Sequence, residues 1–131
     1  MGMKRKYILV CAAACLFFAG CTNSLKSRLN TATKIALNHA GYAAKLQRQE
    51  CLEAGDADCP EAKQIEKWIE YGNRFLVYLN SENFEEDPVL SLLDVVIAEM
   101  KEAGREDLVL YARDIQILLT EMKNERKPET E

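Results

Sequence analysis

The sequence predicts a small all-α protein, a bundle of about four antiparallel helices that form two αα-hairpins after an N-terminal signal peptide. Apolar residues recur at helical spacing in four stretches between Ser24 and Asn124. Short segments with turn and capping residues separate these stretches, which favours antiparallel neighbours. Hydrophobic residues make up 48% of the 131 residues and charged residues 29%, as in globular chains and unlike disordered ones.

The first helix is expected from about Ser24 to Glu53, with Gly55 as its stop signal. Ala occupies most positions of its apolar face, so another helix backbone can approach closely. At 100° per residue the face consists of Leu25, Leu29, Ala32, Ile35, Ala36, Ala40, Ala43 and Leu46.

The second helix is expected from about Pro60 to Leu79, with Asp58 or Cys59 as its N-cap and Asn80 at its end. Pro60 suits a first helical turn, because the missing N–H has no partner there in any case. The inner stripe of this helix consists of Ile65, Trp68, Ile69, Gly72, Phe75, Leu76 and Leu79.

The third and fourth helices form the second expected hairpin. The third begins with Asp87 as its cap and Pro88 in its first turn, and it ends near Gly104. Its apolar face consists of Val89, Leu90, Leu93, Val96, Ile97 and Met100. The fourth extends from about Glu106 to Asn124, and its inward residues are Leu108, Tyr111, Ala112, Ile115, Leu118, Leu119 and Met122.

Residues 1–20 have the three-part form of a secretory signal peptide. A basic segment, Lys4 to Lys6, precedes the uncharged run from Tyr7 to Gly20. That run is shorter than the roughly 20 residues that a helix needs to cross a bilayer. Its length therefore favours a cleaved signal over a membrane-spanning helix.

The end of that run, Phe18-Ala19-Gly20-Cys21, resembles the lipobox of bacterial lipoproteins. The family most often has Leu where this chain has Phe18. The resemblance covers residues 1–22 and implies cleavage between Gly20 and Cys21, with a diacylglycerol and an N-acyl chain on Cys21 as the only attached groups. Two acyl chains suffice for stable anchoring to a membrane.

The lipoprotein resemblance also implies a location. In the enterobacterial sorting rule, Asp after the acylated Cys retains a lipoprotein in the inner membrane, and this chain has Thr22. Delivery to the outer membrane follows, with the protein on the periplasmic face. We expect residues 21–23 to be the lipidated anchor, residues 24–124 the helical domain and residues 125–131 a disordered tail.

Cys51 and Cys59 flank the turn between the first two helices. An exported chain folds in an oxidising compartment, so a disulfide is the default expectation, and it would contribute about 2.5 kcal/mol in the chain-entropy model. Free thiols and a metal site are the alternatives. A metal would need further ligands, and His39 lies far along the first helix, so no metal is expected.

Two helices carry more apolar surface than a one-sided helix needs. An aromatic stripe on the second helix consists of Trp68, Tyr71, Phe75 and Tyr78, and a small stripe on the fourth consists of Leu110 and Ile117. A core role would explain the aromatic stripe. The surplus also predicts a groove or partner surface, because monomeric proteins rarely expose large apolar patches.

The first helix carries a basic stripe of Lys26, Lys34, Lys45 and Arg48, in a region that holds no Asp or Glu between Thr22 and Gln49. It is a candidate contact with anionic lipid headgroups or lipopolysaccharide phosphates near the anchor, and an ordinary solvated face is the other interpretation. Nucleic acid is not expected as a partner, because the chain has a net charge of −4.

The residue inventory points to binding and not to catalysis. No nucleophile motif, phosphate-binding Gly loop or metal-ligand cluster occurs, and His39 is expected to be a satisfied boundary residue. We expect a non-enzymatic adaptor for an envelope protein. Pilotins, small helical lipoproteins that escort secretion-pore subunits, are similar in size, anchor, helical content and a disulfide. The alternatives are an exclusion or immunity lipoprotein of a mobile element, a lipid- or lipopolysaccharide-binding protein, and an enzyme acting on the envelope.

Overall fold

The structure is a computed structural model that describes residues 21–126. Four helices account for nearly all of this range: α2 (Cys21–Glu53), α3 (Pro60–Leu79), α4 (Glu86–Glu102) and α5 (Glu106–Arg126). The expected signal peptide and its cleavage motif, the tail from residue 127 and the side chain of Cys21 lie outside the described residues. Within that range, no helix combines the length and apolarity needed to cross a bilayer.

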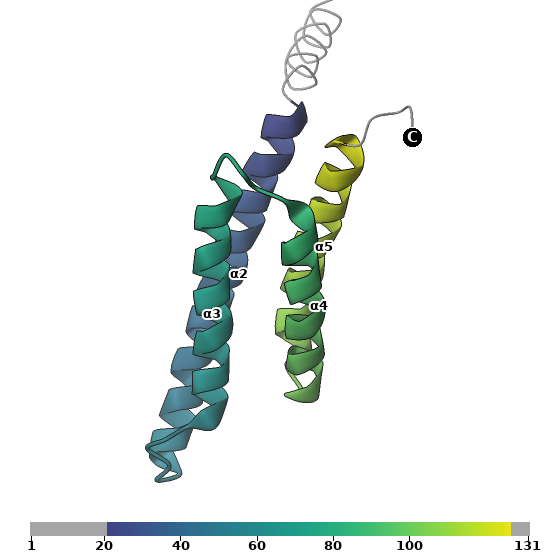
Figure 1. The fold of residues 1–131 in the computed structure, drawn as a ribbon. Coiled ribbons are helices and arrows are strands. Elements are labelled where there is room, and N and C mark those ends of the chain that lie inside the picture. Colours follow the sequence, from purple (N-terminus) through teal and green to yellow (C-terminus); the bar gives the residue numbers. More distant parts are fainter. Residues whose placement is uncertain (1–20, 127–131) are drawn as a thin grey trace, which may run out of the picture.

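The helices form two αα-hairpins, α2–α3 and α4–α5, which lie side by side in an antiparallel arrangement (Figure 1). The closely packed pairs of helices are α2 with α3, α2 with α5, and α4 with α5. Figure 1 shows the α3–α4 connection crossing one end of the bundle, and the α2–α3 hairpin extending farther than α4–α5 at the other end. The prediction of an all-α bundle of four antiparallel helices is confirmed.

Both hairpin turns follow a helix that ends in a left-handed glycine. Gly55 (φ +80°) and Gly104 (φ +73°) occupy a conformation that side chains with a Cβ rarely adopt. After α2, the N–H of Asp56 donates to the carbonyl of Cys51, and after α4 the N–H of Arg105 donates to that of Met100. These bonds satisfy carbonyls that would otherwise be unpaired at each helix end, so the predicted stops at both glycines are confirmed.

The predicted starts of α3 and α4 differ in accuracy. Helix α3 begins at Pro60 after Cys59, as expected. Helix α4 begins at Glu86, and its N-cap is the extended residue Glu85, so the prediction of Asp87 as the cap was wrong. Asp87 lies in the first turn of α4 and forms an ion pair with Lys123 of α5. This turn has a tertiary ion pair and no side-chain cap.

The C-terminal end of α5 extends past the predicted boundary at Asn124, and Glu125 and Arg126 are helical. Arg126 contacts the carboxylate of Glu86 at 2.9 Å and donates to the carbonyl oxygen of Phe84 at 3.2 Å. Glu86 is buried, so it needs this cationic partner. Arg126, which was predicted to lie in a disordered tail, therefore helps to hold α4 against α5.

The inward face of α2 is rotated from the predicted one. Ile35 and Leu46 were expected in the core and are exposed, whereas Thr33 and Ala44 are buried. For Leu46, the reason is that α5 flanks only part of α2. Asp107, at the start of α5, contacts His39, and Leu46 lies two turns beyond that point, where α5 no longer covers the helix.

Candidate functional site

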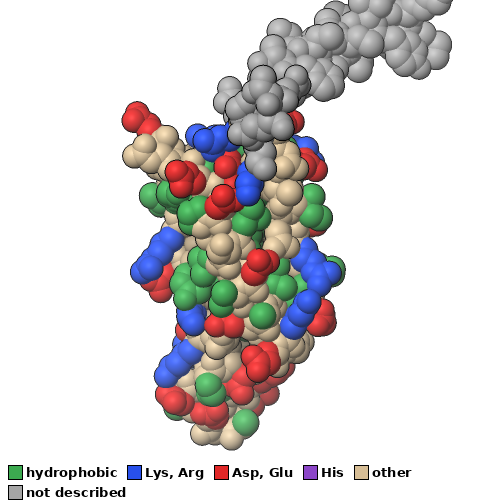
Figure 2. All heavy atoms as spheres, turned by 45° about the vertical axis from the view of Figure 1, so that its right-hand side comes forward, with side chains coloured by type: hydrophobic (Ala, Val, Ile, Leu, Met, Phe, Trp, Pro, Cys, Tyr) green, Lys and Arg blue, Asp and Glu red, His purple; other side chains and the backbone are tan. Residues whose placement is uncertain are grey.

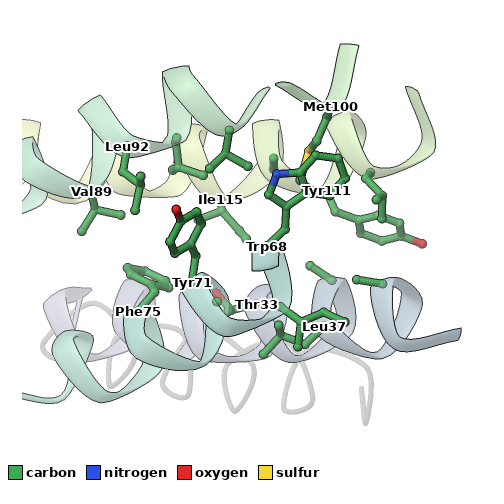
Figure 3. A pocket seen from close by; sticks show the side chains of 18 residues that line it. Thr33, Leu37, Trp68, Tyr71, Phe75, Val89, Leu92, Met100, Tyr111 and Ile115 are labelled. Atoms are coloured by element: carbon green, nitrogen blue, oxygen red, sulfur yellow. The ribbon is translucent and has the colours of Figure 1, made fainter. Parts of the chain in front are cut away.

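An apolar cavity lies between α3 and α4, on the side of the bundle where no close helix pair forms (Figure 3). We call it the α3–α4 groove. Its cavity volume is about 100 Å³. An engineered apolar cavity of about 150 Å³ can take up a benzene molecule, so the groove has room for about one large side chain. Its walls and floor include Thr33, Leu37, Trp68, Tyr71, Phe75, Val89, Leu92, Met100, Tyr111 and Ile115.

The α3 wall of the groove is aromatic. Trp68 is buried, and Tyr71 and Phe75 are half-buried at the mouth. These three residues belong to the predicted aromatic stripe, and the structure brings them together at one cavity. The ammonium of Lys67 lies 5.7 Å from the centroid of the Tyr71 ring, so a cation lies beside the mouth.

One end of the groove is closed by contacts of Glu99 on α4. Its carboxylate accepts hydrogen bonds from the indole Nε1 of Trp68 at 3.0 Å and from Nε2 of Gln64 at 3.5 Å. Lys67 lies 3.7 Å from its other oxygen. These contacts tie α3 to α4 at one level and satisfy the polar edge of Trp68, which otherwise belongs to an apolar wall.

The other end is closed by the connection between α3 and α4. The ring of Phe84 lies in a buried position, 6.1 Å from the ring of Phe75 and 4.9 Å from that of Tyr78, measured between centroids. The hydroxyl of Tyr78 accepts a hydrogen bond from the N–H of Glu85 at 3.0 Å. Tyr78 thus anchors the connection and does not line the groove, although it shares the predicted stripe.

The floor of the groove holds an unpaired hydroxyl. Thr33 is 1% exposed, and its Oγ1 has no hydrogen-bond partner. The small residues Ala36, Ala40 and Gly72 lie around it in the floor. They let α2 and α3 approach so closely that a Cβ on Gly72 would lie 2.6 Å from Cδ2 of Leu37. The floor therefore consists of small side chains, and the α3 wall consists of large aromatic ones.

Helix α4 contributes a ridge that the sequence analysis missed. Leu92 lines the mouth and is 41% exposed, and Val95 follows on the same helical face and is 56% exposed. Pro88 and Glu99 continue this face at helical spacing. The available signal was that Leu92 and Val95 are apolar but fall outside the predicted inward stripe of this helix.

The second predicted apolar stripe lies elsewhere. Leu110 and Ile117 are 67% and 56% exposed on α5, and neither lines the α3–α4 groove. Ile117 borders two shallow surface depressions, one shared with α2 and one with α4. The structure therefore does not combine the six predicted partner-binding residues in one surface. It groups Trp68, Tyr71 and Phe75 and leaves the α5 residues apart.

The predicted basic stripe of α2 is partly engaged within the protein. Arg48 binds the carboxylate of Glu66 on α3 through two nitrogens, and this pairing raises the pKa of the Arg48 guanidinium and lowers that of the Glu66 carboxyl. Lys34 and Lys45 are exposed, and Lys26 is half-buried. Arg48 thus links α2 to α3, and the stripe offers an external ligand fewer cations than its sequence suggests.

The single His contributes to the packing of α2 on α5. His39 Nε2 lies 2.8 Å from Oδ2 of Asp107, and its ring lies 4.9 Å from the Tyr111 ring. Arg105 donates to the same carboxylate oxygen at 2.9 Å. Partial burial would raise the pKa of Asp107, but the hydrogen bond with His39 and the charge of Arg105 lower it below its usual value.

The predicted disulfide between Cys51 and Cys59 is present, with a Cα–Cα distance of 5.6 Å. It joins the end of α2 to the start of α3. Cys59 has φ +42°, a strained value for a residue other than glycine, and Asp56 supports it by accepting its N–H at 3.2 Å. Glu61 lies near both sulfurs, but disulfide sulfurs are not the thiolates that a metal needs, so this trio is not a metal centre.

The lining of the α3–α4 groove suits contact with an apolar group. No charged side chain lines the α3–α4 groove, and its polar side-chain groups are the hydroxyls of Thr33, Tyr71 and Tyr111 and the indole N–H of Trp68. Comparisons with protein-family models, curated proteins and solved structures find no match to this chain.

Proposed function

We propose that this chain is a lipid-anchored envelope protein that binds a protein partner through the α3–α4 groove and catalyses no reaction. The observation that carries the proposal is the groove itself, an apolar depression left open on one side of an otherwise packed bundle. Apolar surface of this kind costs free energy in water, and such surfaces mark interaction sites. The lipobox-like motif ending at Cys21 supports attachment to the outer membrane, with the bundle in the periplasm.

An adaptor of this type resembles the pilotins in its anchor, helical content and disulfide, and this remains an analogy at the level of architecture. An exclusion or immunity lipoprotein of a mobile element would use the same kind of surface, and the identity of the partner separates these two proposals. Binding of lipid headgroups through the basic stripe has less support, because Arg48 already binds Glu66.

The anchor is tested by labelling growing cells with radioactive palmitate. Wild-type protein should carry the label and fractionate with the outer membrane, and Cys21→Ser should lose both properties. An unlabelled wild-type band, or wild-type protein recovered from the cytosol, would show that the lipoprotein proposal is wrong.

The partner is tested by crosslinking in cells, followed by purification under denaturing conditions and mass spectrometry. Leu92→Asp places a charge at the groove mouth, and Leu110→Asp is its matched control on the exposed stripe of α5. A protein captured by wild type and Leu110→Asp but not by Leu92→Asp supports the proposal. Equal capture by all three, with each variant folded by circular dichroism, overturns it.

A further inference from the structure

We propose that two copies of this chain form a parallel dimer through the exposed stripe of α5, with Leu110 packed on Leu110 and Ile117 packed on Ile117 of the second copy. The two-fold axis of this dimer is parallel to α5. The dimer goes beyond the proposed function, and only its placement on a membrane rests on the proposed anchor.

The exposed stripe of α5 faces away from the core of the bundle. Leu110 is 67% exposed and Ile117 is 56% exposed, and their spacing of about two helical turns places them on the same side of the helix. Ile117 borders the depression shared with α2 and the depression shared with α4, so the stripe lies between these two flanks. In Figure 2, hydrophobic side chains at the molecular surface lie among both positive and negative ones. The same stripe of a second copy can cover this one, because two-fold symmetry brings identical surfaces together.

The two flanks of the stripe carry opposite net charges. The depression shared with α2 is lined by one cation and two anions, Arg28, Asp114 and Glu121. The depression shared with α4 is lined by two cations and one anion, Lys101, Arg113 and Asp94. The surface around the stripe is therefore complementary to itself when the flank towards α2 of one copy meets the flank towards α4 of the other.

The relative orientation of the two copies decides which flanks meet. A two-fold axis parallel to α5 keeps each residue at its height along the helix and exchanges the two sides, so the flank towards α2 meets the flank towards α4. An axis perpendicular to α5 makes the two helices antiparallel and places each flank against its own copy, with like net charges together. The charges therefore favour the parallel dimer.

Arg113 and Asp114 provide the central ion pairs of this contact. They are exposed on opposite flanks of the stripe, and neither forms an ion pair within residues 21–126. Adjacent residues of a helix differ in height by only about 1.5 Å, so Arg113 of each copy lies opposite Asp114 of the other. The dimer gains an ion pair on each side of its axis without breaking one inside the chain.

The parallel orientation also suits the proposed anchor. The helices of the bundle are antiparallel to one another, so an axis parallel to α5 is also parallel to α2, and the Cys21 ends of both copies lie at the same end of the dimer (Figure 1). Both lipid anchors can then enter one membrane. Two apolar residues from each copy form a contact smaller than the roughly 1,600 Å² of a standard interface, so the dimer needs the high local concentration that a shared membrane provides.

The test is disulfide crosslinking of the full-length protein in the membranes of its own cells. Leu110→Cys and Ile117→Cys are expressed separately and oxidised with copper phenanthroline, and covalent dimers are measured on non-reducing gels. Each variant should form a dimer with itself. Val77→Cys is the matched control, because Val77 is an apolar residue of α3 that is 76% exposed, and it should give roughly tenfold less dimer.

The orientation is tested by expressing Leu110→Cys and Ile117→Cys together, each with a different tag. These positions differ in height by about 10 Å, which is farther than the roughly 7 Å between Cα atoms that a disulfide can span. The mixed crosslink should therefore be about fivefold less abundant than either self-crosslink. A mixed crosslink that predominates would show an antiparallel contact and overturn the inference.

The charges are tested in the Leu110→Cys background. Arg113→Asp places carboxylates opposite each other and should lower the crosslink yield about threefold or more. Adding Asp114→Arg restores opposite charges and should return the yield to within about twofold of Leu110→Cys alone. A double exchange that stays as low as the single one overturns the inference, and so do equal yields from positions 77, 110 and 117.

These outcomes are separate from those of the proposed function. The exposed stripe of α5 does not line the α3–α4 groove, so Leu110→Asp should abolish the dimer and leave capture of the groove's partner unchanged. Self-crosslinks without a palmitate label on the wild-type protein would overturn the proposed anchor alone. A palmitate label without self-crosslinks would overturn the dimer alone.

Discussion

The contact between α2 and α3 and the side between α3 and α4 show how one helix can be firmly packed along one face and open along another. Towards α2, Gly72 allows close approach to Leu37, and the disulfide joins the helix ends. Towards α4, the bulky residues Trp68, Tyr71 and Phe75 line a cavity, and contacts of Glu99 and Phe84 close its two ends. The difference teaches that side-chain size, and not overall apolarity, decides which side of this bundle closes.

The largest expected effect concerns the covalent link of the closed side. The double change Cys51→Ala and Cys59→Ala should lower the free energy of unfolding by about 2.5 kcal/mol, because the unfolded chain regains the freedom that the short loop removes. Urea denaturation measures the change, and the native emission maximum of Trp68 should stay where it is because the disulfide lies far from the groove. A loss of less than 1 kcal/mol would show that packing alone closes this side.

A second change tests the close approach itself. Gly72→Val should cost about 2 kcal/mol, because the new side chain overlaps Leu37, which can yield only partly into the neighbouring groove. Gly41→Val is the matched control, since a Cβ at Gly41 has no atom within 4 Å and should leave stability almost unchanged. Thermal unfolding of both variants measures the difference. Equal stability would mean that the α2–α3 contact tolerates larger residues than its geometry indicates.

A third change should make the open side more like the closed one. Ala36→Leu adds three apolar carbons at the floor of the groove and should raise the free energy of unfolding by about 1 kcal/mol, which is less than half of the roughly 2.4 kcal/mol expected if each added carbon contributed about 0.8 kcal/mol. Ala98→Leu, on the exposed side of α4, is the control and should change stability little. The filled variant should also lose partner capture. If it binds the partner as well as wild type, the partner does not enter the cavity.

The smallest expected effect concerns the contact between α2 and α5. The pKa of the Asp107 carboxyl is lower in the folded protein than its ordinary value of 3.8. The ionised carboxylate therefore stabilises the fold at a pH above 3.8, and this stabilisation is lost as the pH falls through the pKa of the folded state. Because the carboxylate is 42% exposed, solvent screening keeps the contribution below about 1 kcal/mol. Urea denaturation of wild type and Asp107→Asn should therefore show a constant difference above pH 5 that shrinks below pH 4. A difference that persists at pH 2 would contradict the ionic origin.

Local signals in the sequence were sufficient for most of the fold. Helix boundaries at Pro60, Gly55 and Gly104 follow from backbone preferences that act within a few residues, and they agree with the structure. The start of α4 and the end of α5 were predicted less well. Their positions depend on Asp87 meeting Lys123 and on Glu86 meeting Arg126, and these pairs join residues far apart in the chain.

The candidate site was predicted only on the α3 side. Apolar spacing pointed to Trp68, Tyr71 and Phe75, but the same reasoning added Leu110 and Ile117, which lie on another surface. It missed Leu92 and Val95 because periodicity identifies the face that a helix turns to the core. It cannot show which part of a neighbouring face stays uncovered.

The sequence by itself determined the helices, the hairpin turns and the cysteine pair, because each depends on residues close together in the chain. Only the tertiary structure decided that α5 covers part of α2, that Leu46 is exposed and that a groove separates α3 from α4. The physical reason is that burial depends on which helix lies beside which. Which helices become neighbours depends on the sizes of side chains that are far apart in the sequence. These side chains meet only when the two hairpins pack together.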